Sequence, residues 1–130
     1  MSTDQNKETV RRFATEVLAG GDIDLVDELL APGYVNKGMG GMDRAGFKTM
    51  LPAMGAAMPD RRIVIHNLVA EGDAVVARFT YEMTPATGEK ISARGLTFYR
   101  LVDGRIVEDD PITTPDLMQV LSAQVAPAGA

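Results

Sequence analysis

Residues 61–83 read RRIVIHNLVAEGDAVVARFTYEM, and here the spacing of apolar side chains changes from that of a helix to that of a strand. Apolar and polar residues alternate around Ile63 and Ile65, and the alternation resumes after the turn AEGD. Such a period of two predicts strands with one buried face. The second of these strands would bury Val75, Ala77, Phe79, Tyr81 and Met83.

Two further strands follow this pair. They read EKISARGLTFYRL at residues 89–101 and RIVEDD at residues 105–110. The segments TPATGE and VDGR connect the strands, and both are short and rich in turn residues. Short connections join antiparallel neighbours, so we expect four strands in a largely antiparallel sheet.

Helical spacing precedes the sheet. Three helices are predicted within residues 4–22, 22–30 and 42–58. Asp43 is placed to cap the third helix. Pro52 lies inside that helix and should kink or split it, because proline removes a hydrogen bond and clashes with the previous turn.

A last helix is predicted in TTPDLMQVL, with Thr114 as its N-cap and Pro115 at the first helical position. Helices followed by an antiparallel sheet indicate an α+β fold. We expect a single domain over residues 1–122, with the N-terminal helices packed on a curved sheet. Residues 123–130 would form a flexible C-terminal tail.

The composition excludes several classes of function. Of the 130 residues 45% are hydrophobic and 24% are charged, as in ordinary globular domains. The net charge of -5 argues against nucleic acid or an anionic membrane surface as partner. The chain has no cysteine and one histidine, which excludes thiolate chemistry and multi-histidine zinc sites within one chain. We therefore expect no metal.

Targeting and cofactor patterns are not evident either. The N-terminus lacks the apolar core of a signal peptide, and no apolar run approaches the roughly 18 residues of a membrane span. A cytoplasmic protein is expected. The glycine-rich GMGGM at residues 38–42 lacks the spacing of a phosphate-binding loop, so we expect no cofactor.

Four strings carry a resemblance to a known family: VRRFATEVLAGGDIDLVDELLAPGYV, MPDRRIVIHNLVAEGDAVVARFT, RGLTFYRLVDGRIVE and PDLMQVL. In order and content they resemble the SnoaL-like polyketide cyclases of the nuclear-transport-factor-2-like superfamily. The resemblance covers the chain from about residue 6 to residue 122. It implies a cone-shaped, cystatin-like fold around an apolar cavity, a small hydrophobic ligand, and a homodimer formed through the sheet.

The family's catalytic acid is not carried over. In the cyclases an acid, a variable residue, tryptophan and the catalytic aspartate follow one another on the last strand. Matching DGRIVE and TPDLMQVL without a gap places Asp110 at the tryptophan position and Pro111 at the aspartate position. The chain contains no tryptophan. The resemblance therefore supports the fold more strongly than the reaction.

If the position of the family's aspartate, here Pro111, faces the cavity as the resemblance implies, strand alternation turns Asp109 toward the cavity too. Asp109 shares a face with Val107 and Pro111, whereas Ile106 and Asp110 would share the opposite face. Burial would raise the pKa of Asp109 and suit it to general acid/base work. Asp110 could reach the cavity only if Pro111 forces a bulge. Alternatively, both acids lie at a solvated rim.

Other polar candidates lie on neighbouring segments. Arg94, on the strand expected to pair with the last one, could orient Asp109 or polarise a carbonyl; otherwise it is an exposed surface residue. Asn36 and Lys37 lie in the loop YVNKG, where a lysine could stabilise an enolate or simply be solvated. His66 is expected on the non-core face with Val64 and Leu68 and is a weaker candidate base.

Apolar and aromatic residues would form the wall of the cavity. Met50 and Met54 recur at helical spacing, which is typical of a core but also of an adaptable wall for a flat hydrophobic ligand. The aromatic candidates for substrate binding are Phe13, Phe79, Tyr81 and Tyr99.

These patterns lead to one functional hypothesis and two alternatives. The first is a cofactor-free acid/base enzyme of secondary metabolism, such as antibiotic biosynthesis, that closes a ring or isomerises a polyketide-like, apolar, oxygenated molecule. Asp109, Arg94 and Asp110 are its candidate catalytic residues. The alternatives are a non-catalytic small-molecule-binding or accessory protein, and a hydroxylase or epoxide hydrolase of the same fold.

Overall fold

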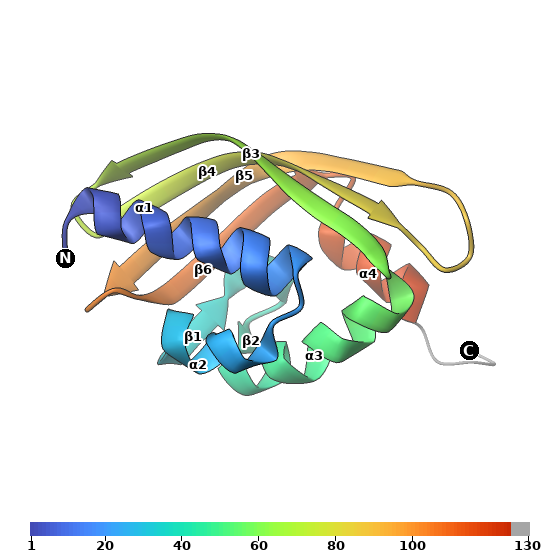
Figure 1. The fold of residues 1–130 in the computed structure, drawn as a ribbon, viewed down its shortest axis with the longest axis horizontal. Coiled ribbons are helices and arrows are strands. Elements are labelled where there is room, and N and C mark those ends of the chain that lie inside the picture. Colours follow the sequence, from blue (N-terminus) through green and yellow to red (C-terminus); the bar gives the residue numbers. More distant parts are fainter. Residues whose placement is uncertain (126–130) are drawn as a thin grey trace.

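The computed structural model describes residues 1–125 and has the predicted α+β architecture (Figure 1). The expected tail therefore lies mostly outside the described residues, although the last helix continues past residue 122. The helical elements are α1 (Thr3–Arg12), the π-helical η1 (Phe13–Ala19), the 3-10 helix η2 (Ile23–Leu25), α2 (Val26–Leu29), the 3-10 helix η3 (Lys37–Met39), α3 (Arg44–Ala57) and α4 (Leu117–Val125).

The sheet has six strands in the order β2-β1-β6-β5-β4-β3. Their bounds are β1 (Leu30–Asn36), β2 (Met42–Asp43), β3 (Asp60–Glu71), β4 (Ala74–Thr84), β5 (Ile91–Val102) and β6 (Arg105–Thr114). The four long strands are antiparallel, as predicted. The sequence did not predict that β1 would pair with β6, in parallel, because this segment was interpreted as the end of a helix and a loop.

The long strands form an arch, and α1 lies against its concave side (Figure 1). Below α1, the segment with α2, β1 and α3 closes the open side of the arch (Figure 1). The core fills the space between these layers. Its largest fully buried side chains include Phe13, Tyr34, Phe47, Leu51, Met54 and Met83. All five residues predicted for the buried face of β4 are buried.

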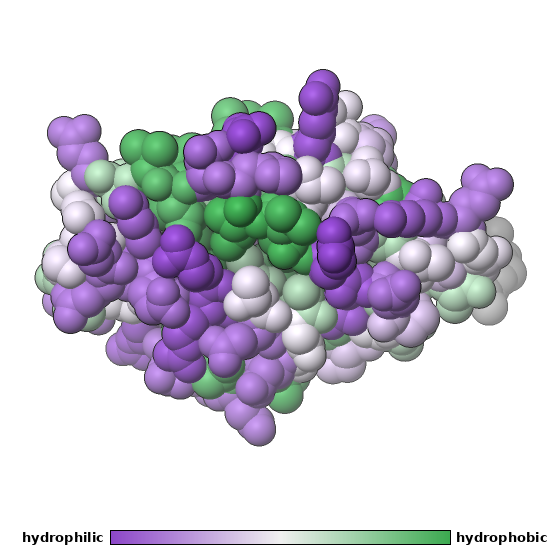
Figure 2. All heavy atoms as spheres, turned by 45° about the horizontal axis from the view of Figure 1, so that its top comes forward, coloured by the Kyte–Doolittle hydropathy of each residue, from purple (hydrophilic) through white to green (hydrophobic). Residues whose placement is uncertain are grey.

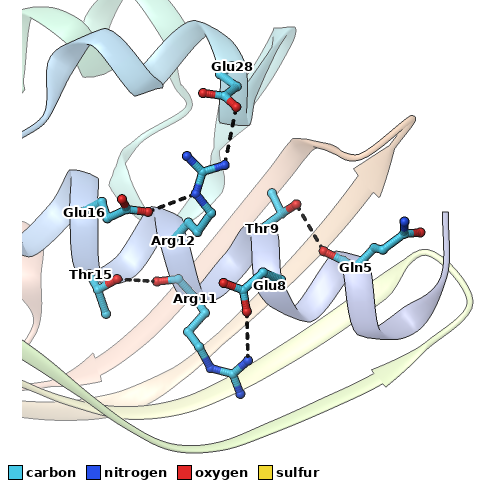
Figure 3. Close-up of polar contacts among 8 residues, drawn as sticks. All are labelled: Gln5, Glu8, Thr9, Arg11, Arg12, Thr15, Glu16 and Glu28. Atoms are coloured by element: carbon cyan, nitrogen blue, oxygen red, sulfur yellow. Dashed lines mark hydrogen bonds and ion pairs between the residues drawn. The ribbon is translucent and has the colours of Figure 1, made fainter.

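Polar side chains on the exposed side of the continuous α1–η1 helix contact each other and α2. Arg12 donates from Nε to Glu16 at 2.9 Å and from Nη1 to Glu28 at 3.4 Å, which links the α1–η1 helix to α2 (Figure 3). Thr15 donates its hydroxyl hydrogen to the carbonyl of Arg11 (Figure 3). The opposite side of this helix faces the concave side of the sheet, and Val10 on that side is fully buried.

The predicted cap of α4 was wrong, and so was the predicted split of α3 at Pro52. Pro52 lies within α3, which runs unbroken from Arg44 to Ala57. The proline is exposed, so solvent can hydrogen-bond the carbonyl that it leaves free. Thr114 does not cap α4, because it is still extended and pairs with Arg94 in β5.

The start of α4 is capped differently from the prediction. The hydroxyl of Thr113 accepts a hydrogen bond from the backbone N–H of Leu117 at 2.9 Å. The carboxylate of Asp116 accepts one from the backbone N–H of Gln119 at 3.2 Å. These two side chains satisfy N–H groups that the first turn of a helix cannot bond internally.

A β-bulge in β6 sets the direction of its side chains. Arg100 pairs with Glu108 but Leu101 pairs with Ile106, so Val107 is an extra residue in β6. Ile106 and Asp109 consequently both face the core, at 0% and 3% exposure. The expectation that Ile106 lies on the opposite face from Asp109 is therefore wrong, whereas the inward direction of Asp109 is as predicted.

Candidate functional site

An apolar cavity of about 60 Å³ lies between the concave face of the sheet and the helices. Side chains of α1, η1, α3, the four long strands and the start of α4 line it. Its few polar wall residues are Asn36, Tyr81, Thr97, Tyr99 and Asp109. Apolar walls with a few polar groups are typical of small-molecule sites.

Asp109 is the acid of this cavity and belongs to a buried polar cluster with Tyr34 and Asn36, here called the Asp109 cluster. Its Oδ2 accepts hydrogen bonds from the phenol of Tyr34 at 2.9 Å and from Nδ2 of Asn36 at 3.4 Å. Its Oδ1 is buried and has no hydrogen-bond partner among the described residues. One oxygen of the carboxyl is thus held by two donors, and the other has no hydrogen bond.

The parallel pairing of β1 with β6 builds this cluster. Asn36 lies directly beside Asp109 in the register, and Tyr34 lies two residues earlier on the same face of β1. The Oδ1 of Asn36 accepts a hydrogen bond from the backbone N–H of Met39 at 3.0 Å, which fixes the orientation of the amide. Gly38 allows η3 to approach β6, since a Cβ there would lie 2.4 Å from the carbonyl oxygen of Pro111.

Burial raises the pKa of Asp109 from 3.8 to about 7. The hydrogen bond from Tyr34 lowers this pKa and the nearby charge of Asp110 raises it, but both effects are smaller than that of burial. Among the described residues, no lysine or arginine lines the cavity to compensate the charge. A carboxyl group that titrates near neutrality can both accept and donate a proton.

The phenols around the cavity remain protonated. Burial raises the pKa of Tyr34 and of Tyr99 well above the usual value, and the charge of Asp109 raises both further. Burial also raises the pKa of Tyr81 to about 12. Tyr81 donates to the backbone carbonyl of Leu18 at 3.3 Å. Tyr99 pairs directly with Asp109 across the β5–β6 ladder.

Most of the predicted wall residues do line the cavity. These are Asn36, Met50, Met54, Phe79, Tyr81 and Tyr99. Phe13 is fully buried and lies behind the wall, where its ring packs against the rings of Phe47 and Tyr99 at centroid distances of 5.5 and 6.2 Å. Phe13 thus supports the wall rather than forming it.

Three predicted polar residues lie away from the cavity. Arg94 is exposed and lines a groove on the outer face of the sheet together with His66. Arg94 is on the strand that pairs with β6, as predicted, but its partner there is Thr114. Asp110 pairs with Phe98 on the outer face, and Pro111 introduces no shift in the register. The structure therefore does not bring Arg94 and Asp110 to Asp109.

Lys37 also lies on the outer side. Its Nζ forms an ion pair with Glu108 at 3.3 Å, and its side chain is 56% exposed. Lys37 is the first residue of η3, and β1 ends at Asn36, so the side chain of Lys37 is no longer part of the inner face of the strand. Lys37 and Asn36, although adjacent in the sequence, have different environments.

Sequence reasoning missed two polar residues of the site. Tyr34 was not singled out, although its spacing of two from Asn36 would have placed both on one face once a strand was assigned to residues 30–36. Thr97 is 2% exposed and lines the cavity. It lies two residues before Tyr99 on β5, and the same alternation would have identified it.

The described residues contain no group of three or more His, Asp or Glu side chains arranged to hold a metal ion. No helix within the described part of the chain is long and apolar enough to cross a membrane.

The fold and the cavity together define a class: cone-shaped α+β proteins in which an arched sheet and helices enclose an apolar cavity. Within this class, the SnoaL-like domain matches residues 10–109. The chain belongs to the SnoaL-like domain family, and its six-stranded curved sheet with packed helices agrees with the fold that the resemblance implied. No curated protein sequence matches the chain.

Solved structures share this fold over nearly their whole length. A candidate polyketide cyclase from Acidithiobacillus ferrooxidans is 30% identical, with 95% of this chain and 99% of that chain covered and a TM-score of 0.76. IdmH, a candidate polyketide cyclase from Streptomyces antibioticus, is 26% identical, with coverage of 92% and 99% and a TM-score of 0.75. An M. tuberculosis LEH-like epoxide hydrolase is 21% identical, with coverage of 95% and 93% and a TM-score of 0.76. The fold thus accommodates different reactions.

Proposed function

We propose that the cavity is an active site in which Asp109 moves a proton, without a cofactor, on a polyketide-like, apolar, oxygenated small molecule. The reaction would be an aldol-type ring closure or an isomerisation, as in secondary metabolism such as antibiotic biosynthesis. The observation that carries this proposal is the buried carboxyl of Asp109, whose pKa is about 7 and whose Oδ1 is free beside an apolar cavity.

The chemistry follows from that carboxyl. Oδ1 of the ionised Asp109 removes a proton from the carbon next to a ketone, and the electrons of the C–H bond move to the ketone oxygen to form an enolate. In a ring closure the enolate carbon attacks a second carbonyl, which forms a C–C bond while the π electrons of that carbonyl move to its oxygen, and this oxygen takes the proton. In an isomerisation the substrate is a β,γ-unsaturated ketone, so its enolate is a conjugated dienolate that takes the proton at the γ-carbon. Asp109 returns the proton in either case. Tyr99, a protonated cavity phenol beside Asp109, is the candidate donor to the enolate oxygen.

Deuterium exchange of cyclohexanone in D₂O tests the proton-transfer step without the natural substrate. The wild-type protein should exchange the protons next to the ketone at neutral pD, as followed by NMR. Asp109→Asn should reduce this exchange by roughly 10²-fold or more, since general base catalysis contributes about that much. Glu108→Gln makes the same chemical change one residue earlier on the outer face and should exchange like the wild type. Full exchange by Asp109→Asn would rule out the acid/base role.

A non-catalytic, ligand-binding protein is the second candidate function. Pro111, which lines the cavity, occupies the position of the family's catalytic aspartate, and this substitution favours binding without turnover. Binding of cyclohexanone with no exchange by the wild-type protein, while added free base still exchanges it, would support this candidate against the enzyme.

We also propose that a second copy of the chain covers the outer face of the sheet. Apolar residues gather in the middle of this face, bordered by hydrophilic ones (Figure 2). Leu96 and Ile112 are paired there across β5 and β6 at 51% and 75% exposure, next to the exposed Phe98. Ile112→Lys should convert a dimer to a monomer in sedimentation experiments. A wild-type monomer at all concentrations would contradict this proposal.

A further inference from the structure

A second pocket of about 110 Å³ adjoins the cavity at the side where η3 meets the start of α4. We call it the outer compartment; Thr113, Asp116 and Met118 line it but not the cavity. Met39, Pro111 and Leu117 line both spaces and so form a partition between them. The two spaces are therefore neighbours separated by three side chains.

The partition consists partly of adaptable groups. Met39 and Leu117 are partly buried apolar side chains at the edge of the core. Methionine is unbranched and repacks easily around irregular shapes, and leucine can change rotamer. Pro111 is rigid and held close to Gly38. The movable part of the partition is thus Met39 and Leu117.

Size alone makes the inner cavity insufficient for an extended ligand. Its volume of about 60 Å³ is well below the roughly 300–1,000 Å³ of sites for drug-sized ligands. A ligand that places a ketone beside Asp109 must extend further. The outer compartment is the nearest space on the same side as Pro111.

We propose that the outer compartment is a second subsite of the same site and holds the neutral, hydroxyl-bearing end of a ligand whose ketone lies beside Asp109. This inference rests on the proposed function. The carboxylate of Asp116 lines this compartment, and among the described residues no lysine or arginine lines it. Such a wall accepts hydrogen bonds from hydroxyl groups and repels carboxylates.

Methyl ketones of increasing length, from butan-2-one to octan-2-one, test the subsite in the wild-type protein. Labelled methionine methyl groups report the location by NMR, because Met50 and Met54 line only the inner cavity and Met118 only the outer compartment. Butan-2-one should shift the signals of Met50 and Met54 alone, whereas octan-2-one should also shift that of Met118. Affinity should continue to increase by up to about fourfold for each added methylene.

The end group tests the chemical class. 8-Hydroxyoctan-2-one should bind at least as tightly as octan-2-one. 7-Oxooctanoate should bind about fivefold more weakly, because its carboxylate would lie without a cation beside Asp116, which is exposed and whose repulsion solvent reduces. Asp116→Asn should reduce the difference in affinity between 8-hydroxyoctan-2-one and 7-oxooctanoate. An equal or higher affinity for the carboxylate would overturn the assignment of a neutral ligand.

Met118→Trp should fill the outer compartment, because Met118 lines that compartment and not the cavity. It should remove the gain in affinity from butan-2-one to octan-2-one, while butan-2-one still binds. Gln119→Ala, an exposed change on the same helix, is the control and should bind the whole series like the wild type.

The proposal is wrong if octan-2-one leaves the Met118 signal of the wild-type protein unchanged, and this result does not depend on the folding of any variant. It is also wrong if Met118→Trp keeps the full gain in affinity. The NMR shift of Met118 and the affinities can be measured without turnover. Asp109→Asn should therefore give the same Met118 shift as the wild type. Loss of the subsite and loss of proton transfer can therefore be told apart.

Discussion

Glu108 and Asp109 are adjacent acids on β6 whose surroundings are opposite. Glu108 forms ion pairs on the outer side with Arg100 at 2.9 Å and with Lys37 at 3.3 Å. The hydrogen bond from Arg100 lowers the pKa of Glu108, with a smaller contribution from Lys37. Asp109 faces the cavity, has two neutral hydrogen-bond donors, and has its pKa raised by burial.

The same contrast repeats on the neighbouring strand. Asn36 points inward to Asp109, and Lys37, the next residue, points outward to Glu108. β6, together with the end of β1 and the start of η3, thus separates charged side chains on the outer side from a neutral inner set around one acid. A cation near in sequence does not neutralise the cavity acid, because the chain leaves β1 after Asn36 and Lys37 pairs with Glu108 on the outer side. The following experiments test that separation.

Asp109→Asn should give the largest effect, an increase in stability above neutral pH. The rise of its pKa from 3.8 to about 7 corresponds to a penalty of about 4 kcal/mol for the ionised form. Below pH 3.8 the acid is protonated in both states and costs nothing. From there to about pH 7 only the unfolded chain loses the proton, so the free energy of unfolding of the wild type falls; above pH 7 the loss is complete.

Urea denaturation at pH 4 and pH 8 measures this effect. Between these pH values the wild type should lose free energy of unfolding through Asp109, and Asp109→Asn should not. The free energy of unfolding of the variant minus that of the wild type should therefore be several kcal/mol larger at pH 8 than near pH 4. A difference between variant and wild type that does not change with pH would contradict the raised pKa and with it the contrast between the two acids.

The sequence was sufficient to predict the fold because its long strands have a regular period. Alternation through residues 74–84 identified every buried side chain of β4. β1 was not predicted because buried and exposed residues do not alternate along it. Leu30 and Ala31 are both buried, while Pro32 and Gly33 are both exposed. Its identity as a strand depends on tertiary pairing with β6, which no local pattern encodes.

The site could be predicted only in part for the same reason. Asp109 was found by alternation counted from the family's last strand, and the conclusion survived the bulge at Val107 because the bulge precedes it. Tyr34 and Asn36 join Asp109 only through the parallel β1–β6 pairing. Arg94 was expected beside Asp109 because its strand pairs with β6, but the register places Tyr99 opposite that acid.

Tyr34→Phe should give an intermediate effect by removing the hydrogen bond that favours the ionised form of Asp109. The pKa of Asp109 should rise by a further unit or so, because a hydrogen bond to a charged group contributes about 1.5 kcal/mol or more. Titration of the Asp109 carboxyl carbon by NMR measures the shift directly. The acidic limb of the pH profile for deuterium exchange should move to higher pH by the same amount.

Tyr99→Phe is the matched control for Tyr34→Phe. It deletes another buried phenol of the same cavity, yet the phenol that hydrogen-bonds Asp109 is that of Tyr34. Tyr99→Phe should therefore leave the pKa of Asp109 close to 7. Equal shifts in the two variants would mean that general polarity of the cavity, rather than the Tyr34 hydrogen bond, offsets the effect of burial.

Glu108→Gln should give the smallest effect, and its sign should be opposite to that of Asp109→Asn. Its ion-pair partners Lys37 and Arg100 are 56% and 46% exposed, so solvent and salt screen the interaction. At pH 7 the variant should be less stable than the wild type, by no more than about a quarter of the Asp109 effect. Because the pKa of Glu108 is lowered in the folded state, this difference should disappear as the pH falls through that lowered pKa.

Denaturation of Glu108→Gln at pH 7 in low and in high salt completes the comparison. High salt should abolish the small loss of stability, whereas the penalty for ionised Asp109 should persist, since a buried charge is screened much less. A Glu108→Gln effect that is as large as that of Asp109→Asn, or that resists salt, would mean that the outer ion pairs are not solvated. The two faces of β6 would then differ in charge but not in dielectric surroundings, and the raised pKa of Asp109 would need another cause.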